Sequence, residues 1–401
     1  MKITSVEVFV LGKASKDLAL SSQWRPIGCR IHTDEGIYGD GEAAMAFGTG
    51  APAAFGMICD LAKIIMGQDP LRIDYLWDMM YRTSFWGQNG GPVVFAGIAA
   101  LDIALWDIKG KYFNCPIYQL LGGKHRDKLR CYASQLQLGW PNLGAEKYEL
   151  AHKTEEYAQS AIKAVEDGYD AIKIDFMQND TEKGAFHFQK KVGILSKEML
   201  NIAEERMAAV RDAVGTKVDI IVENHSFTCA NGAIQIAKIA EKYDVMCIEE
   251  PNTPSPQTSR YLKQNINIPI ANGERIYTRW QYAPYFADQT IQLIQPDIGN
   301  CGGITEVRKI ADMAHTYDVL VQAHAFASPL SSDVAAQFEV AIPNFCIHEH
   351  AVCYRMAFNM GLTKYNRQPV EGLIEPSELP GIGNEFLQEA ISKAQMYCIV
   401  K

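Results

Sequence analysis

Residues 220–225 read IIVENH, so three β-branched apolar residues run directly into a carboxylate, an amide and an imidazole. The apolar half is typical of a buried strand. The polar half has no place in a core unless its groups are paired, which puts Glu223 and His225 at the carboxyl end of the strand. What these two side chains do depends on where the other strands end.

Similar apolar runs recur from about residue 128 onward and alternate with longer helical patterns, which is typical of parallel strands joined by crossover helices. Most later intervals are roughly 25 residues, as a (β/α) barrel requires, and one longer interval leaves room for an excursion around 178–200. The runs end at Ser134, Asp175, Glu223, Glu249, Glu274, Asp297, His324 and Glu349.

The first ~125 residues show no such alternation. Strand patterns cover 2–10, 27–32 and 37–43, with a hairpin turn at 33–36, so an antiparallel sheet is expected. A helical period follows over 96–111. The chain has 401 residues, and strand–helix alternation is present only in its later part. Together these predict two domains, a smaller one followed by a large barrel.

Composition excludes several classes of function. The net charge of -9 is spread along the chain without a basic stripe, which argues against a nucleic-acid or anionic-membrane partner. The ten cysteines form no CxxC pair, so neither a disulfide frame nor a zinc knuckle is expected, and a reducing cytoplasm fits best. The start has the alternation of a strand and lacks the apolar core of a signal peptide, and no apolar run is long enough to span a membrane.

Three carboxylates end three consecutive strands. Glu223, Glu249 and Glu274 would converge at one face of the barrel and repel one another unless a cation lay between them, and oxygen-only ligands favour Mg²⁺. The alternative is three separate carboxylates paired with basic residues such as Arg275. Glu250 competes with its neighbour for the ligand role, but adjacent strand residues face opposite sides, and the spacing favours Glu249.

Acid–base groups end the neighbouring strands. Asp297 and His324 fall on consecutive strands, and an Asp beside a His fixes the tautomer of the imidazole and raises its basicity. His225 points to the same side as Glu223, two residues earlier. Lys173 and Asp175 share one face of the second strand and are expected among the substrate-binding residues. The lysine could hold a substrate carboxylate or take a proton, or the two could form an internal ion pair.

The chain resembles the mandelate racemase branch of the enolase superfamily, and in particular its acid-sugar dehydratases. The resemblance covers essentially the whole chain. The matching motifs are TDEGIYGDGE at 33–42, ALDIALWDIKGK at 100–111, YQLLGG at 118–123, IEEP at 248–251, NGE at 272–274 and QPDIGNCGGITE at 295–306.

The resemblance implies an α/β fold, a (β/α)7β modified TIM barrel over 126–369. An α+β capping domain over 1–125 would be completed by the C-terminal segment 370–401. It further implies a homo-oligomer, a dimer or an octamer.

The resemblance also implies roles for the residues at the strand ends. Glu223, Glu249 and Glu274 resemble the Mg²⁺ ligands, and His324 with Asp297 resembles the catalytic dyad. Glu349 resembles the carboxylic acid that hydrogen-bonds the enolate, and Lys173 would help to stabilise that enolate. His225 resembles the general acid of the galactonate and mannonate dehydratases.

One position departs from the racemase pattern. Racemases of this branch carry Lys-x-Lys on the second strand, whereas here Asp175 stands at the second position. The implied reaction is therefore a hydro-lyase dehydration of a sugar acid, an aldonate such as galactonate, mannonate or gluconate, to a 2-keto-3-deoxy acid. The alternatives are a racemase or epimerase of a 2-hydroxy acid, and a binding protein on the same fold that has lost catalysis.

Three segments of the first domain are expected to close over the substrate: 21–26, 43–50 and 84–91. They combine glycines with aromatic residues, which places Trp24 and Trp86 among the substrate-binding residues, although both could instead be packed core residues. A dinucleotide site at Gly39–Ala44 is disfavoured because its strand belongs to a hairpin. A phosphate site at Gly299–Gly303 competes with an ordinary barrel turn.

Overall fold

The computed structural model describes residues 1–12, 24–182 and 184–401. The first sheet is antiparallel and joins the two ends of the chain. Val6 in the first strand pairs with Val400 in the last strand. Its strand order is β13-β1-β2-β3. The strands are β1 (Ile3–Val10), β2 (Ile27–Thr33), β3 (Tyr38–Ala43) and β13 (Met396–Val400).

In the described part of the chain, four helices lie between β3 and the barrel. They are α1 (Ala51–Ile65), α2 (Ile73–Thr83), α3 (Pro92–Tyr112) and α4 (Ile117–Leu120). The predicted helix over 96–111 lies within α3, which is buried along most of its length.

Two glycines let α3 lie directly on β3. A Cβ at Gly41 would come within 1.9 Å of the carbonyl oxygen of Ala100, and one at Gly39 within 2.1 Å of that of Ala104. Only glycine allows so close an approach of backbone to backbone. The glycines of the TDEGIYGDGE motif therefore serve packing between sheet and helix, not a dinucleotide.

The second sheet is a parallel barrel of eight strands in the order β10-β9-β8-β7-β6-β5-β4-β11. A parallel bridge between Val321 and Phe345 brings β10 against the segment before β11 and closes the ring. The strands are β4 (Leu129–Ser134), β5 (Ala171–Ile174), β6 (Asp219–Glu223), β7 (Cys247–Glu249), β8 (Ile270–Asn272), β9 (Leu293–Ile294), β10 (Leu320–Val321) and β11 (His348–Ala351).

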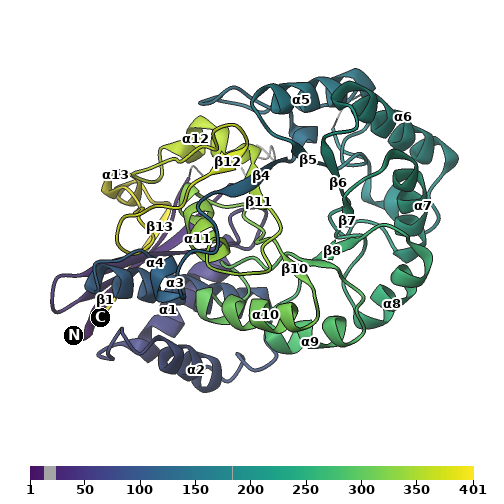
Figure 1. Cartoon of the computed structure of the whole chain (residues 1–401). Coiled ribbons are helices and arrows are strands. Elements are labelled where there is room, and N and C mark those ends of the chain that lie inside the picture. The colour runs from purple at the N-terminus through teal and green to yellow at the C-terminus, as the bar shows by residue number, and fades with distance from the viewer. Residues whose placement is uncertain (13–23, 183) are drawn as a thin grey trace.

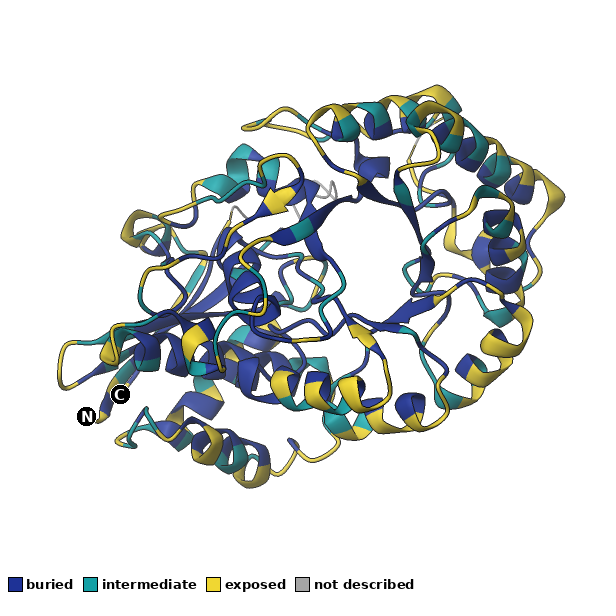
Figure 2. Ribbon diagram, viewed as in Figure 1, coloured by how far each residue is buried: buried dark blue, intermediate teal, exposed yellow. Residues whose placement is uncertain are grey.

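Seven helices connect the barrel strands. Figure 1 shows them outside the ring of strands. Figure 2 shows the strands buried and the outer faces of most of these helices exposed, whereas the last helix, Pro329–Glu339, is buried almost throughout. They are α5 (Thr154–Glu166), α6 (Lys197–Val214), α7 (Ala230–Ala240), α8 (Pro256–Asn265), α9 (Thr278–Ala287), α10 (Ile304–Thr316) and α11 (Pro329–Glu339). The expected (β/α)7β barrel with a separate antiparallel sheet is confirmed.

Short elements complete the chain. After the barrel, β12 (Leu373–Ile374) pairs antiparallel with β4, and α12 (Ala357–Met360) and α13 (Gln388–Ser392) flank it in the sequence. The long connection between β5 and α6, where an excursion was expected, contains the 3-10 helix η3 (Phe188–Lys191). The segment between α4 and β4 contains the proposed boundary near residue 125, and the division into domains stays a prediction.

Buried polar contacts fasten the first sheet and its helices to the barrel. Glu42 of β3 accepts hydrogen bonds from the backbone N (3.0 Å) and Oγ (2.6 Å) of Ser328, the N-cap of α11. Asp102 of α3 accepts one from the backbone N of Thr305 at the start of α10 (3.0 Å). Trp106 Nε1 donates to Thr305 Oγ1 (2.9 Å). The two parts therefore hold each other at the N-termini of barrel helices.

Candidate active site

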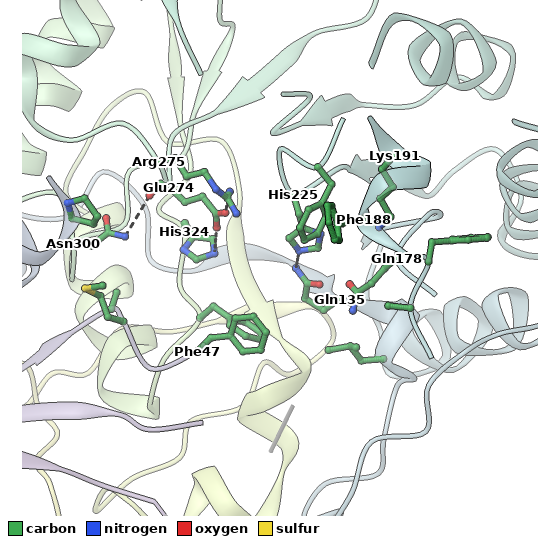
Figure 3. A pocket seen from close by; sticks show the side chains of 18 of the residues that line it. Phe47, Gln135, Gln178, Phe188, Lys191, His225, Glu274, Arg275, Asn300 and His324 are labelled. Atoms are coloured by element: carbon green, nitrogen blue, oxygen red, sulfur yellow. Dashed lines mark hydrogen bonds and ion pairs between the residues drawn. The ribbon is translucent and has the colours of Figure 1, made fainter. Parts of the chain in front are cut away.

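A cavity of about 560 Å³ opens at the carboxyl ends of the barrel strands. Residues that precede α1, including Ala44 and Phe47, form part of its wall. The cavity is thus shared between the barrel and the first 125 residues, as Figure 3 shows for its labelled side chains. Its polar lining consists of Gln135, Gln178, Lys191, His225, Glu274, Arg275, Tyr277, Asn300 and His324.

Two of the three expected ligand residues, Glu223 and Glu249, are direct partners in the pairing of β6 with β7, and both are buried. Glu223 Oε1 accepts hydrogen bonds from the backbone N atoms of Asn224 (2.9 Å) and His225 (2.6 Å). Glu249 Oε2 accepts one from Gln295 Nε2 (2.5 Å). Both carboxylates are therefore fixed in place beneath the cavity.

Glu274 directly follows Gly273, where the ends of two neighbouring parallel strands approach each other closely. A Cβ at Gly273 would come within 2.4 Å of the backbone of Gln295, so the glycine of the NGE motif is required there. Glu274 Oε2 lies 2.7 Å from His324 Nε2, and its other oxygen contacts Arg275. Glu274 lines the cavity and faces two cationic side chains.

Lys173 is surrounded by carboxylates. Its Nζ lies 2.5 Å from Glu249 Oε1, 2.9 Å from Glu349 Oε1 and 3.4 Å from Glu223 Oε2. Burial disfavours the ammonium, but these carboxylates outweigh it and hold the pKa of Lys173 well above its ordinary value. Lys173 therefore forms internal ion pairs in this structure. Its partners are the three glutamates and not Asp175, the partner that the sequence suggested.

The carboxylates beneath the cavity carry more negative charge than the nearby cations balance. Burial and the neighbouring Glu223 raise the pKa of Glu249 well above its ordinary value, because two adjacent carboxylates share too little positive charge. Within the described part of the chain, acidic and histidine side chains form no cluster arranged to hold a metal ion. The donors nevertheless suit a hard cation chemically, since all three are carboxylates that end neighbouring strands.

Glu250 faces away from this group. Its backbone is left-handed (φ 43°), and its carboxylate accepts hydrogen bonds from the backbone N of Gly273 (3.0 Å) and from Ser226 Oγ (2.5 Å). Arg275 Nη1 lies 3.1 Å from it. The geometry therefore places Glu249, and not Glu250, beside Glu223. Pairing with Arg275, the alternative considered for the ligand glutamates, is found for Glu250 and Glu274.

His324 and Asp297 form a close pair. His324 Nδ1 lies 2.7 Å from Asp297 Oδ2, and Asp297 Oδ1 accepts from the backbone N of Gly299 (2.8 Å). Burial opposes the imidazolium, but Glu274, Glu349 and Asp297 raise the pKa of His324 well above its ordinary value. The bond at Nδ1 leaves Nε2 on the cavity side, where it contacts Glu274 Oε2 in this structure.

The glycines after Asp297 are used for packing. A Cβ at Gly299 would come within 2.8 Å of the backbone N of Ala44, and one at Gly303 within 2.3 Å of Asp102 Oδ2. Gly302 O accepts from Trp77 Nε1 (2.7 Å). The loop is thus held against α2, α3 and β3, which favours the ordinary barrel turn over a phosphate site.

His225 forms a second pair of the same kind. Its Nδ1 lies 2.8 Å from Asp175 Oδ2, and Asp175 Oδ1 accepts from the backbone N of Met177 (2.8 Å). The Nε2 of His225 is 3.3 Å from Gln135 Nε2 at the cavity wall. Burial opposes the charged form, but Glu223 and Asp175 raise the pKa of His225. The carboxylate of Asp175 thus pairs with His225, and its expected role in substrate binding stays a prediction.

Glu349 accepts a hydrogen bond at each of its carboxylate oxygens. Its Oε1 accepts from Ser134 Oγ (2.6 Å), and its Oε2 accepts from the backbone N of Ala325 (2.9 Å). Burial opposes its ionisation, but Lys173 and His324 lower the pKa of Glu349 to about 2. Both oxygens of Glu349 thus accept hydrogen bonds in this structure, and its expected hydrogen bond to the enolate stays a prediction. Its evident part is to hold Lys173 and the loop before α11.

Neither tryptophan lies in the cavity wall as far as the structure describes it. Trp24 is buried, stacks edge-on against Phe326 and donates from Nε1 to Asn359 Oδ1 (3.2 Å). Trp86 is 72% exposed, next to Phe85. The alternative of a packed core residue fits Trp24 but not the exposed Trp86, and substrate binding by either tryptophan stays a prediction. Residues 21–23 of the first expected closing segment lie outside the described residues.

Many wall residues do not end a predicted strand, among them Phe47, Gln135, Gln178 and Lys191. Phe47 does lie in the expected closing segment 43–50. Gln135 directly follows a strand end, so extending the rule by one residue would have found it. Gln178 and Lys191 lie in the excursion after β5, where no periodic signal marks individual side chains.

Family comparisons agree with this geometry. Residues 156–390 match the model of the enolase C-terminal domain-like family, and residues 19–122 match the N-terminal domain model of the mandelate racemase/muconate lactonizing enzyme family. The two matches together cover most of the chain. The protein belongs to the mandelate racemase/muconate lactonizing enzyme family of the enolase superfamily, as the sequence motifs predicted.

Individual relatives are similar over their full length. A member of the enolase superfamily from Salmonella Typhimurium is 45% identical, with a TM-score of 0.94 and coverage of 100% of both chains. A solved structure from Zymomonas mobilis ZM4 is also 45% identical, with a TM-score of 0.94 and coverage of 100% of this chain and 99% of that chain. The D-galactonate dehydratase of Pectobacterium atrosepticum is 30% identical over 98% of this chain and 94% of its own length.

Proposed function

We propose that the protein is a hydro-lyase that dehydrates a sugar acid to a 2-keto-3-deoxy acid. One observation carries the proposal: two His–Asp pairs, His324 with Asp297 and His225 with Asp175, present imidazoles to a single cavity. Dehydration needs one group to take a proton and another to give one. Relatives named D-galactonate dehydratase, at 30–31% identity, support the same reaction class.

The first step is assigned to His324. Its Nε2 takes the proton from C2 of the substrate, and the electron pair of the C–H bond passes into the carboxylate as an enolate. General-base catalysis typically contributes about 10²–10⁴-fold, too little alone for so weak an acid. A second source of stabilisation is therefore required for the charge that builds on the carboxylate.

Magnesium, which is typical of this family, is the cofactor that we propose. Glu223, Glu249 and Glu274 would hold it, and it would supply electrostatic stabilisation of the developing negative charge. Lys173 contributes positive charge from beneath, through its contacts with Glu223, Glu249 and Glu349.

The second step is assigned to His225. It protonates the hydroxyl at C3, the C3–O bond breaks with loss of water, and the electron pair of the enolate forms a C2–C3 double bond. The resulting enol tautomerises to the 2-keto-3-deoxy acid. The hydrogen bond from Nδ1 to Asp175 keeps the other nitrogen of His225 toward the cavity.

Racemisation of a 2-hydroxy acid is the second candidate, and it would need a base on each face of C2. The two residues available on β5 are both engaged: Lys173 in the carboxylate network and Asp175 with His225. That engagement favours dehydration. A binding protein without catalysis would be expected to lack a dyad or ligand residue, and all of them are present.

Location and assembly complete the proposal. The ten cysteines are all free in the structure, which fits the reducing cytoplasm. None of the helices in the described part of the chain is long and apolar enough to cross a membrane. A homo-oligomer, dimer or octamer, stays a prediction.

A panel of aldonic and aldaric acids, incubated with the protein and Mg²⁺ in heavy water, tests the function. Formation of a keto acid that reacts with semicarbazide is the expected result. Deuterium at C2 of recovered acid with no keto acid would indicate a racemase. A panel in which ligands bind but neither change occurs would contradict both activities and indicate a binding protein.

A further inference from the structure

Lys191 is a buried lysine at the wall of the cavity. It ends η3 in the excursion between β5 and α6, and only 4% of its surface is exposed. Its ammonium lies over the ring of Phe227, with Nζ 4.6 Å from the ring centroid. Unlike the lysines on the molecular surface, it therefore presents its charge to the substrate cavity.

No acidic side chain in the described part of the chain forms an ion pair with Lys191. Asp175 is the one carboxylate that acts on it electrostatically, and Asp175 pairs with His225 instead. Lys173, also buried, has three carboxylates within 3.4 Å. A buried charge without a counterion is costly, so Lys191 is a site where an anion carried by a ligand would be stabilised.

The position of Lys191 indicates which end of the substrate it would meet. Figure 3 shows it on the side of His225 and Gln178, across the cavity from His324, Glu274 and Asn300. In the proposed reaction the C1 carboxylate and C2 lie on the His324 side, and C3 faces His225. Carbons beyond C3 would then extend toward Lys191.

We propose that Lys191 binds a second carboxylate at the far end of the substrate, so that the preferred substrates are aldaric acids, which carry a carboxylate at both ends. The inference rests on the proposed dehydration. A neutral hydroxymethyl end would leave the ammonium without a counterion, whereas Gln135 and Gln178 already offer neutral partners for hydroxyl groups. Burial lowers the pKa of Lys191, and an incoming carboxylate would restore the charged form.

The test compares a hexaric acid with the hexonic acid of the same configuration, since the two differ only at C6. For the wild-type protein, we expect kcat/KM to be higher for the preferred hexaric acid than for the hexonic acid of the same configuration. Lys191→Met should lower kcat/KM for the aldaric acid by about 10²–10³-fold, mainly through KM, because a desolvated charge pair is lost. The same variant should change the aldonic value by less than about threefold.

Lys190→Met is the matched control. Lys190 is adjacent and exposed and does not line the cavity, although its Nζ lies 5.7 Å from the ring centroid of Phe186, a wall residue. It should leave both values unchanged. Equal losses for the two acids in Lys191→Met, or a wild type that prefers aldonic acids, would overturn the assignment.

Binding separates a failure of this subsite from a failure of the proposed reaction. If wild type dehydrates no acid of the panel, the reaction is wrong, and calorimetric titration of the hexaric acids with Mg²⁺ present decides the subsite alone. Binding by wild type that is lost in Lys191→Met would support it. Binding that survives in the variant, or that is absent from wild type, would refute it.

Discussion

Carboxylates at the mouth of the barrel and at the contact of the first sheet and α3 with the barrel helices have different surroundings. At the mouth, Glu249 and Glu349 lie against the ammonium of Lys173, and Glu274 lies against His324. At the contact, Glu42 and Asp102 accept hydrogen bonds from backbone amides or a hydroxyl at helix N-termini. All of these carboxylates are buried except Glu274, which is partly exposed, and the two groups have different partners.

Burial alone therefore does not mark a functional acid. A carboxylate held by amides and a hydroxyl can be protonated and still fill its place, as the pKa of about 7 for both Glu42 and Asp102 indicates. Carboxylates that share cations are electrostatically coupled, so a change in one alters the others. Variants at the mouth should therefore affect activity, and variants at the contact should affect stability.

The largest effect is expected from Glu249→Gln. Loss of this carboxylate removes a proposed Mg²⁺ ligand and a partner of Lys173, so kcat should fall by about 10³-fold or more. The response of the residual activity to added Mg²⁺ should also weaken. Steady-state kinetics across a Mg²⁺ titration gives both quantities.

Glu250→Gln is the matched comparison, one residue away and equally buried. It loosens the contact with Arg275, which should lower the free energy of unfolding by about 1–3 kcal/mol and leave the Mg²⁺ response intact. If Glu250→Gln abolishes that response and Glu249→Gln does not, the ligand assignment is wrong.

A smaller effect is expected from Asp175→Ala. Without the carboxylate at Nδ1, the ring of His225 loses its fixed orientation, and dehydration should fall by about 10²-fold. Removal of the C2 proton by His324 should continue, so deuterium from heavy water should accumulate at C2 of the unconsumed acid. Keto acid formation and C2 labelling are measured in the same sample.

Asp175→Asn tests whether Asp175 acts by positioning His225. The amide oxygen can still accept from Nδ1, so this variant should recover part of the lost dehydration. A general disturbance of the barrel would instead lower dehydration and C2 exchange in parallel in both variants.

The smallest effect on activity is expected from Glu42→Gln, at the contact. Burial raises the pKa of Glu42 from an ordinary 4.5 to about 7. Above pH 4.5 the unfolded chain releases this proton while the folded protein keeps it until about pH 7, so stability falls as pH rises through that window. For this one group the loss is on the order of 3 kcal/mol.

Glu42→Gln should remove that share of the pH dependence, because the amide resembles the protonated acid in both states. Urea unfolding at pH 4.5 and pH 7 gives the difference in free energy for wild type and variant. Glu35→Gln, at an exposed position, is the control and should keep the wild-type pH dependence. An unchanged pH dependence in Glu42→Gln would show that Glu42 is ionised in the folded state.

Much of the fold followed from the sequence because the signals are periodic. The spacing of apolar runs from Ser134 to Glu349 reflects one strand and one helix per unit, and the barrel repeats that unit. The approach of Glu223 to Glu249 followed as well, because the carboxyl ends of parallel strands share one face.

Side-chain partners in the irregular segments could not be predicted in the same way. Asp175 pairs with His225, which follows the next strand. The spacing of residues within one strand does not specify a contact with a residue beyond another strand. Trp24 and Trp86 were assigned by composition, which cannot separate a packed ring from one that faces a ligand. Lys191 lies in a connection without regular period, so its burial became visible only in three dimensions.

The central claim is that the two His–Asp pairs divide the reaction, with His324 removing the C2 proton and His225 protonating the departing hydroxyl. The direct measurement is deuterium at C2 of unconsumed acid, together with keto acid, for His225→Asn and His324→Asn in heavy water. The account predicts label without keto acid for the first variant and neither for the second. Keto acid formed at the wild-type rate by His225→Asn, or label in His324→Asn, would contradict it.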